Sequence, residues 1–183
     1  GSTHAGEEEI ILDAHQQLIA EHPNLVLILA PRRIERVKEV VTLLKKRNIS
    51  FTLRSSLKLA ETVILLDTMG ELAKVYSLGQ VALIGKSLVK PGGGHSLIEP
   101  LSYGLPVLHG PFVENIGHVA DKAHELGLAI TVQDSKNIKE KVHNFLENKN
   151  LRQELAENAL SFTTEQKGAS EKMAEIITKT LVI

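Results

Sequence analysis

Six short apolar runs, each separated from the next by a longer polar or helical stretch, constrain the fold of this chain more than any other feature. They lie at residues 25–30, 50–53, 62–66, 81–84, 106–109 and 128–132. Runs of this length are typical of buried strands and are too short for buried helices. Strands that alternate with long connections form a parallel sheet covered by helices on both faces. The sequence therefore predicts a doubly wound, Rossmann-like α/β domain.

Helices are predicted before, within and after this alternating region. Residues 7–21 carry three glutamates in the first turn, where the helix dipole favours negative charge. Apolar residues recur at helical spacing from Ile34 to Leu44. Three amphipathic segments follow the last strand, at 138–145, 151–160 and 169–181. We expect residues 1–183 to form one domain, with a linker and helix up to about residue 22 and a helical tail from about residue 135.

Composition excludes several classes of function. A net charge of −1 and an aromatic content of 3% argue against nucleic acid as a partner. The absence of cysteine removes disulfides, thiolate catalysis and cysteine-based zinc sites. No apolar run approaches the roughly 18 to 20 residues of a membrane-spanning helix, so we expect a soluble chain. The eight histidines show no spacing typical of metal ligands, so the sequence predicts no metal.

The loops that follow the strands are the predicted binding site, because ligands of doubly wound sheets lie beyond the carboxyl ends of the strands. In residues 91–96, successive glycines such as Gly93 and Gly94 allow backbone amides to approach an anion, and Ser96 can cap a helix at 97–103. A phosphate cradle and a flexible surface turn are equally compatible with this loop. Glu99 can accept hydrogen bonds from ribose hydroxyls or act as a capping-box carboxylate.

Two further loops carry candidate anion ligands. Arg32 follows the first strand, where its forked donors can neutralise a phosphate; the alternative is that Arg32 and Arg33 are both simply solvated. Asp67 or Thr68 can cap a helix beginning at Met69, whose first free amides would face the cleft. An ordinary capped helix is the alternative for this second loop.

Six pieces of the sequence together resemble consecutive signatures of the bacterial Kdo (3-deoxy-manno-octulosonic acid) transferases. The resemblance covers residues 1 to about 131, and the helical remainder agrees only in character. The pieces are GSTHAGEEE at 1–9, LAPRRIER at 29–36, LLDTMGEL at 65–72, IGKSL at 84–88, GGGHSLIEPLSYGLPVLHGP at 92–111 and FVEN at 112–115.

The resemblance implies one half of a GT-B glycosyltransferase, in which two Rossmann-like domains face each other across a cleft. This chain would be the carboxy-terminal donor domain, which binds CMP-Kdo, and Gly1 and Ser2 would be native linker residues. The absent amino-terminal domain would approach the lipid A precursor and supply the catalytic base. The transfer would be inverting, metal-independent and without a cofactor, at the cytoplasmic side of the bacterial inner membrane. An isolated donor domain would then bind its donor and transfer nothing.

Carried over position by position, the resemblance assigns no catalytic residue to this chain and places the donor contacts in three loops. The sequence departs from the family pattern at Ser96, where the family usually has Asn, and at Leu97, where it has Pro. A UDP-sugar epimerase of the same fold and a non-catalytic nucleotide-binding domain are the alternatives, and a preference for UDP over CMP would favour the epimerase. The assigned contacts are Pro31, Arg32, Met69, Gly70, Glu71, Gly93, Gly94, His95, Ser96, Leu97, Ile98 and Glu99.

Overall fold

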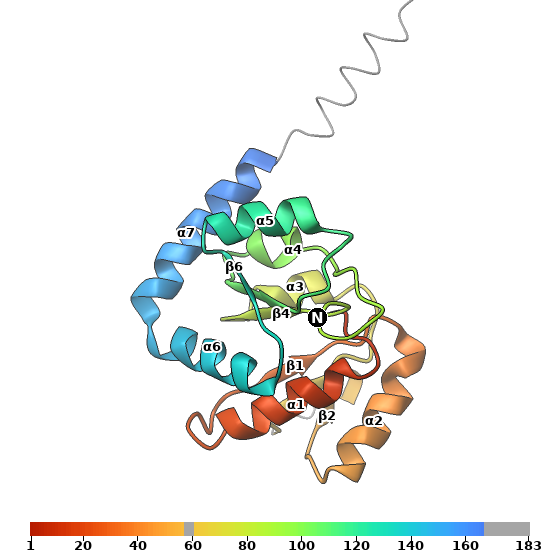
Figure 1. The fold of residues 1–183 in the computed structure, drawn as a ribbon. Coiled ribbons are helices and arrows are strands. Elements are labelled where there is room, and N and C mark those ends of the chain that lie inside the picture. Colours follow the sequence, from red (N-terminus) through yellow and green to blue (C-terminus); the bar gives the residue numbers. More distant parts are fainter. Residues whose placement is uncertain (57–60, 167–183) are drawn as a thin grey trace, which may run out of the picture.

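The computed structural model describes residues 1–56 and 61–166, and this part of the chain alternates helices with short strands (Figure 1). All of the predicted strands are present, each shorter than its apolar run. The elements are α1 (Glu7–Leu18), β1 (Leu27–Leu29), the 3-10 helix η1 (Ile34–Arg36), α2 (Val37–Lys46), β2 (Thr52–Leu53), the 3-10 helix η2 (Arg54–Ser56), β3 (Val63–Leu65), α3 (Leu72–Tyr76), β4 (Ala82–Ile84), α4 (Ile98–Leu101), β5 (Val107–His109), α5 (Gly117–Glu125), β6 (Ala129–Thr131), α6 (Ser135–Glu147) and α7 (Lys149–Gln166).

The strands form two parallel three-stranded sheets, in the orders β1-β3-β2 and β4-β5-β6. Within the first sheet Leu29 and Leu53 both pair with Leu65, and within the second Ile84 pairs with His109. Parallel pairing places the carboxyl ends of neighbouring strands at the same edge of a sheet. The predicted parallel α/β class is therefore confirmed, and the loops singled out in the sequence lie at these carboxyl ends.

Residues 1–3, which the sequence predicts as a linker, lie between the two sheets. Thr3 forms an isolated parallel bridge with Pro31, just beyond β1, and its amide donates to the Ala30 carbonyl over 3.0 Å. On the other side, the Gly1 carbonyl accepts from the Gly85 amide, just beyond β4, over 2.8 Å. Figure 1 accordingly shows the amino terminus next to β4. This segment joins β1 to β4 through the backbone at the edge where the predicted loops gather.

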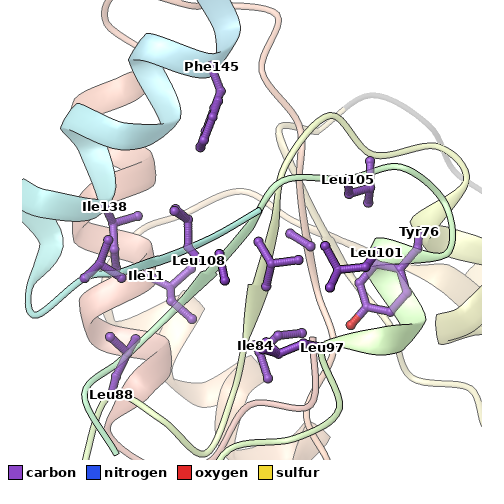
Figure 2. Packing of buried hydrophobic residues seen from close by; sticks show 14 of the residues in the cluster. Ile11, Tyr76, Ile84, Leu88, Leu97, Leu101, Leu105, Leu108, Ile138 and Phe145 are labelled. Atoms are coloured by element: carbon purple, nitrogen blue, oxygen red, sulfur yellow. The ribbon is translucent and has the colours of Figure 1, made fainter. Parts of the chain in front are cut away.

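One hydrophobic core includes side chains from both sheets and from the helices (Figure 2). Leu12 of α1, Leu29 of β1, Leu108 of β5 and Phe145 of α6 are all buried. Burying such a side chain stabilises the fold by about 1.5–3 kcal/mol. Because α6 contributes Phe145 to this core, the first part of the predicted helical tail belongs to the domain. The predicted helix at 169–181 lies outside the described residues.

Two predicted helices differ from those in the structure. The helix expected to begin at Met69 begins at Leu72, because Gly70 has a φ of +78° that interrupts helical geometry. The helix expected at 97–103 spans only Ile98–Leu101, and no side chain caps it, so Ser96 is not its cap. Both helices are therefore single turns preceded by irregular loops. Among the described helices, none has the length and hydropathy that would let it cross a membrane.

Candidate functional site

A cavity of about 330 Å³ lies where the loops after β1, β3 and β4 meet. This volume falls within the range of about 300–1,000 Å³ found for small-molecule sites. The lining of a second cavity, of about 370 Å³, includes no Asp, Glu, Lys or Arg side chain, so we assign the candidate site to the first. The first is lined by Ser2, Arg32, Gly70, Leu72, Ala73, Tyr76, Ile84, His95, Ser96 and Glu99.

The structure brings together five of the residues that the sequence assigns to the donor: Arg32, Gly70, His95, Ser96 and Glu99. The other assigned residues do not line this cavity. Among them, Leu97 is buried in the core, and Met69 is 72% exposed. The remainder are Pro31, Glu71, Gly93, Gly94 and Ile98. Their assignment as donor contacts stays a prediction.

Arg32 presents an uncommitted positive charge to the cavity. Its guanidinium has neither a hydrogen bond nor an ion pair within the described ranges, and its side chain is exposed. Arg36, on the same segment, differs because two of its nitrogens donate to the buried Glu8 carboxylate at 2.7 and 3.2 Å. The amide of Arg32 donates to Thr3, which fixes the backbone of this loop over 3.0 Å. Arg32 is therefore held at its backbone while its charge is free for an anion.

The glycine loop has a different construction from either alternative left open by the sequence. The Gly93 amide donates to the Phe112 carbonyl over 3.0 Å, and the Gly94 amide donates to Lys86 over 2.7 Å. Both residues have positive φ, and a Cβ on Gly94 would lie 2.7 Å from Ile116 Cδ1. The loop is thus packed against the segment after β5, and these two glycine amides are not free donors.

The amides that follow these glycines are the ones available to a ligand. In the part of the chain that the structure describes, those of His95, Ser96 and Leu97 donate to no protein acceptor. Three consecutive free N–H groups beside Arg32 are suited to bind an anion. The free amides therefore lie a few residues after the glycines for which the sequence predicts anion binding, in the same loop.

His95 is held by a second imidazole. Its Nε2 lies 3.1 Å from Nε2 of His4, and the two rings are stacked with centroids 5.3 Å apart. Burial, together with the nearby charges of His4, Arg32 and Lys86, lowers the pKa of His95 to about 4. His95 is therefore uncharged near neutral pH and can contribute hydrogen bonds rather than charge. The positive charges of Arg32 and Lys86 make this region attractive to an anion.

Glu99 and Tyr76 occupy the side of the cavity formed by α3 and α4. The Glu99 carboxylate is exposed and forms no capping-box bond to an amide in the described residues, so simple capping does not account for it. Tyr76 is buried, and this burial, together with the charge of Glu99, raises the pKa of its phenol. The sequence analysis missed Tyr76, which lies four residues after Leu72 and therefore on the same helical face. Figure 2 shows Tyr76 beside Leu101 at the edge of the core.

The Glu71 carboxylate already accepts hydrogen bonds from within the protein. Its carboxylate accepts from Arg54 Nη2 over 3.1 Å and from the hydroxyl of Thr68. Asp67 is used in the same way, since it accepts from the amide and the hydroxyl of Ser55 over 2.9 and 2.5 Å. These bonds hold the loop after β3 to the loop after β2. They shape the wall of the cavity on the Gly70 side.

Comparisons with known proteins agree with this fold. The family model for "Glycosyl transferases group 1" matches residues 8–162. Proteins named 3-deoxy-D-manno-octulosonic acid transferase are similar to this chain. The one from Haemophilus influenzae is 37% identical, and the match covers 96% of this chain and 42% of that protein. The one from Aquifex aeolicus is 34% identical, and the match covers 80% of this chain and 40% of that protein. The chain thus spans less than half the length of these relatives.

A solved structure shows the same fold. The crystal structure of the C-terminal CMP-Kdo binding domain of WaaA from Acinetobacter baumannii matches with a TM-score of 0.81 and 32% identity. The match covers 86% of this chain and 83% of that one. The resemblance to Kdo transferases and the Rossmann-like fold of a GT-B half are therefore confirmed.

Proposed function

Because this chain belongs to the group 1 glycosyltransferases, we propose that it is the domain of a Kdo transferase that binds the donor CMP-Kdo. One observation carries the proposal: Arg32, His95, Ser96 and Glu99 line a single cavity, and among the described residues the Arg32 guanidinium and the amides of His95 and Ser96 have no protein partner. The relative of known structure, whose title describes a CMP-Kdo binding domain, supports the choice of ligand. In this proposal residues 1–183 act as one donor-binding domain.

The two ends of the cavity suit the two ends of a nucleotide. The phosphate is bound by Arg32 and by the amides of His95 and Ser96, which together provide charge and directed donors. The ribose hydroxyls donate to Glu99, which faces the same cavity. Ser96 contributes a hydroxyl where the family usually has an amide, and it lines the cavity without serving as a helix cap.

The same groups serve the chemistry of transfer. When the bond to the anomeric carbon breaks, CMP leaves with an additional negative charge on its phosphate. Arg32 and the free amides stabilise that charge, so this step proceeds without a metal ion. The dipoles of α3 and α4 contribute little, since these helices contain only five and four residues. The base that deprotonates the acceptor belongs to the other half of the enzyme.

The full-length protein then transfers Kdo, with inversion, to a lipid A precursor at the cytoplasmic side of the inner membrane. The relatives named as Kdo transferases support this assignment. Each of them is more than twice as long as the segment it shares with this chain, which leaves room for an acceptor-binding half.

Calorimetric titration with CMP and UDP, in the presence of a chelator, tests the proposed site. Arg32→Ala removes a charged hydrogen-bond donor worth about 1.5–3 kcal/mol, so we expect CMP affinity to fall about tenfold to a hundredfold. Arg33→Ala is the matched control, because Arg33 is also exposed but does not line the cavity. We expect the control to bind CMP as the unchanged chain does.

Each other outcome contradicts a defined part of the proposal. Tighter binding of UDP than of CMP would favour the sugar epimerase. Equal effects of the two arginine substitutions would remove Arg32 from the site. Binding that disappears in the chelator would contradict the metal-free site, and a chain that binds neither nucleotide would contradict donor binding by this domain.

A further inference from the structure

Glu21, His22 and His143 meet where the segment after α1 passes over α6. None of them lines the nucleotide cavity. We propose that these three side chains form a binding site for Zn²⁺ or a similar transition-metal ion. The site is separate from the nucleotide cavity, and the proposal does not depend on the proposed function.

The potential ligand atoms already have spacing close to that of a metal site. Each of the three residues offers one ligand atom, and these three atoms all lie within 4.8 Å of one another. His22 Nε2 is 3.0 Å from His143 Nδ1, and His143 Nδ1 is 3.1 Å from Glu21 Oε2. Tetrahedral zinc with bonds of about 2.0–2.1 Å needs ligand atoms about 3.3 Å apart. The two distances to His143 Nδ1 would need to lengthen by a few tenths of an ångström, and the ligand atoms of His22 and Glu21, which lie within 4.8 Å of each other, would have to reach the same spacing.

A neighbouring side chain holds Glu21 in an orientation suited to coordination, and a second carboxylate lies near His22. Lys139 Nζ lies 2.7 Å from Glu21 Oε1, which leaves Oε2 directed at His143. On the other side of the His22 ring, Nδ1 lies 3.8 Å from Glu147 Oε1. A carboxylate near the second ring nitrogen of a ligating histidine fixes the ring and its tautomer. Glu147 can take this position and, with Glu21, offsets the charge of the ion and of Lys139.

The ligand set and its exposure indicate the class of metal. Two imidazoles with one carboxylate suit zinc and its first-row neighbours rather than calcium or magnesium. The side chains of Glu21 and His143 are 44% and 40% exposed, so an ion can enter and water can complete its coordination.

Two other histidine pairs, His4–His95 and His109–His124, provide an internal comparison. In the described ranges, neither pair belongs to a group of three potential ligands. Only the pair at α6 therefore meets the minimum ligand number for a protein metal site.

An ion at this place would connect the chain after α1 to α6. Figure 1 shows α1 and α6 next to each other. Metal that binds the folded chain and not the unfolded one raises the free energy of unfolding. The ion would therefore stabilise the packing of α1 on α6, and it would leave the nucleotide cavity unchanged.

Titration of the chelator-stripped chain with zinc chloride tests the site. We expect one saturable site, and a weakening of about a hundredfold in His143→Ala and in His22→Ala. His118→Ala is the control, since His118 is exposed on α5 and lies outside all three pairs. The control variant should bind zinc as the unchanged chain does.

Two further measurements keep the outcome clear. Circular dichroism without metal establishes that each variant is folded, because the altered side chains are not in the core. Cobalt(II) in place of zinc should give the visible absorption of a tetrahedral site in the unchanged chain and not in His143→Ala. Zinc binding of equal strength in all variants, or several weak sites in the unchanged chain, would overturn the proposal.

Discussion

Four backbone amides donate to the carboxylate of Glu7, near the candidate cavity. Its Oε1 accepts from the amides of Ser87 and Leu88 over 2.8 and 2.9 Å, and its Oε2 accepts from those of Lys86 and His4, each over 2.8 Å. The carboxylate is fully buried. It thereby ties the loop after β4 to the segment carrying His4, which in turn contacts His95.

We predict that Glu7→Gln lowers the free energy of unfolding by about 3 kcal/mol. Whichever oxygen becomes the amide NH₂, two of the four amide donors lose their acceptor and face another donor at the buried Glu7 side chain. Urea denaturation followed by circular dichroism measures the change.

Glu9→Gln is the matched control for this substitution. Glu9 lies two residues further along α1 and is exposed, so its replacement should change stability by no more than about 0.5 kcal/mol. Similar unfolding midpoints for the two variants would mean that the amide network does not depend on the charge of Glu7.

At the scale of elements, β5 and α5 are joined by a histidine pair, in which His109 is buried and His124 is exposed. His109 Nε2 lies 2.6 Å from His124 Nε2, and His109 Nδ1 lies 2.7 Å from the Gly110 carbonyl. Because a carbonyl only accepts, the Nδ1 atom carries the proton of a neutral His109, and His124 then donates to Nε2. Burial, with the neighbouring His124, lowers the pKa of His109.

We predict that stability falls as the solution is acidified, and that His109→Gln reduces this fall. The unfolded chain takes up a proton at His109 near its ordinary pKa of about 6.5, whereas the folded chain does so only at lower pH. The contribution of His109 is therefore complete above about pH 6.5 and is lost as the pH falls through its folded pKa. Burial also lowers the pKa values of His4, His15 and His95, so the variant should retain part of the dependence.

Unfolding free energies measured between about pH 7 and about pH 5 give this dependence. His118→Gln serves as the control, since His118 is exposed on the same helix as His124. A slope that is identical in the unchanged chain and in His109→Gln would show that buried His109 does not contribute to acid sensitivity.

At the scale of the whole molecule, the candidate cavity lies at one edge of the domain rather than in its interior. Arg32, Ser96 and Glu99 all line it while remaining exposed. The chain spans only 42% of the length of its Haemophilus influenzae relative. A second half facing these residues would complete a cleft between two domains.

We predict that the 183-residue chain transfers no Kdo from CMP-Kdo to a lipid A precursor. The reason is that the acceptor half and its base lie outside this segment in the proposed arrangement. Radiolabelled Kdo in the lipid fraction is the measurement, with the full-length Haemophilus influenzae relative as the positive control. Label above background with this chain alone would refute the proposal that the acceptor-binding half and its base lie outside this segment.

The sequence by itself determined the parallel α/β class, the order of the strands and helices along the chain, and the loops that meet at the candidate cavity. This information is local, because a run such as 62–66 or the helical spacing from Ile34 to Leu44 shows burial without knowledge of distant residues. The rule that ligands lie at the carboxyl ends of parallel strands then selected the loops that contain Arg32 and Glu99.

The tertiary structure decided which groups in those loops are free to act. Gly94 donates to Lys86, Glu7 accepts from a loop 80 residues away, and His22 meets His143 across 121 positions. Hydrogen bonds of this kind form between segments that are distant along the chain. The periodicity of apolar residues is a local pattern and does not predict which distant segments come into contact. For this reason the sequence identified the site loops, while only the folded chain showed that the free amides follow the glycines.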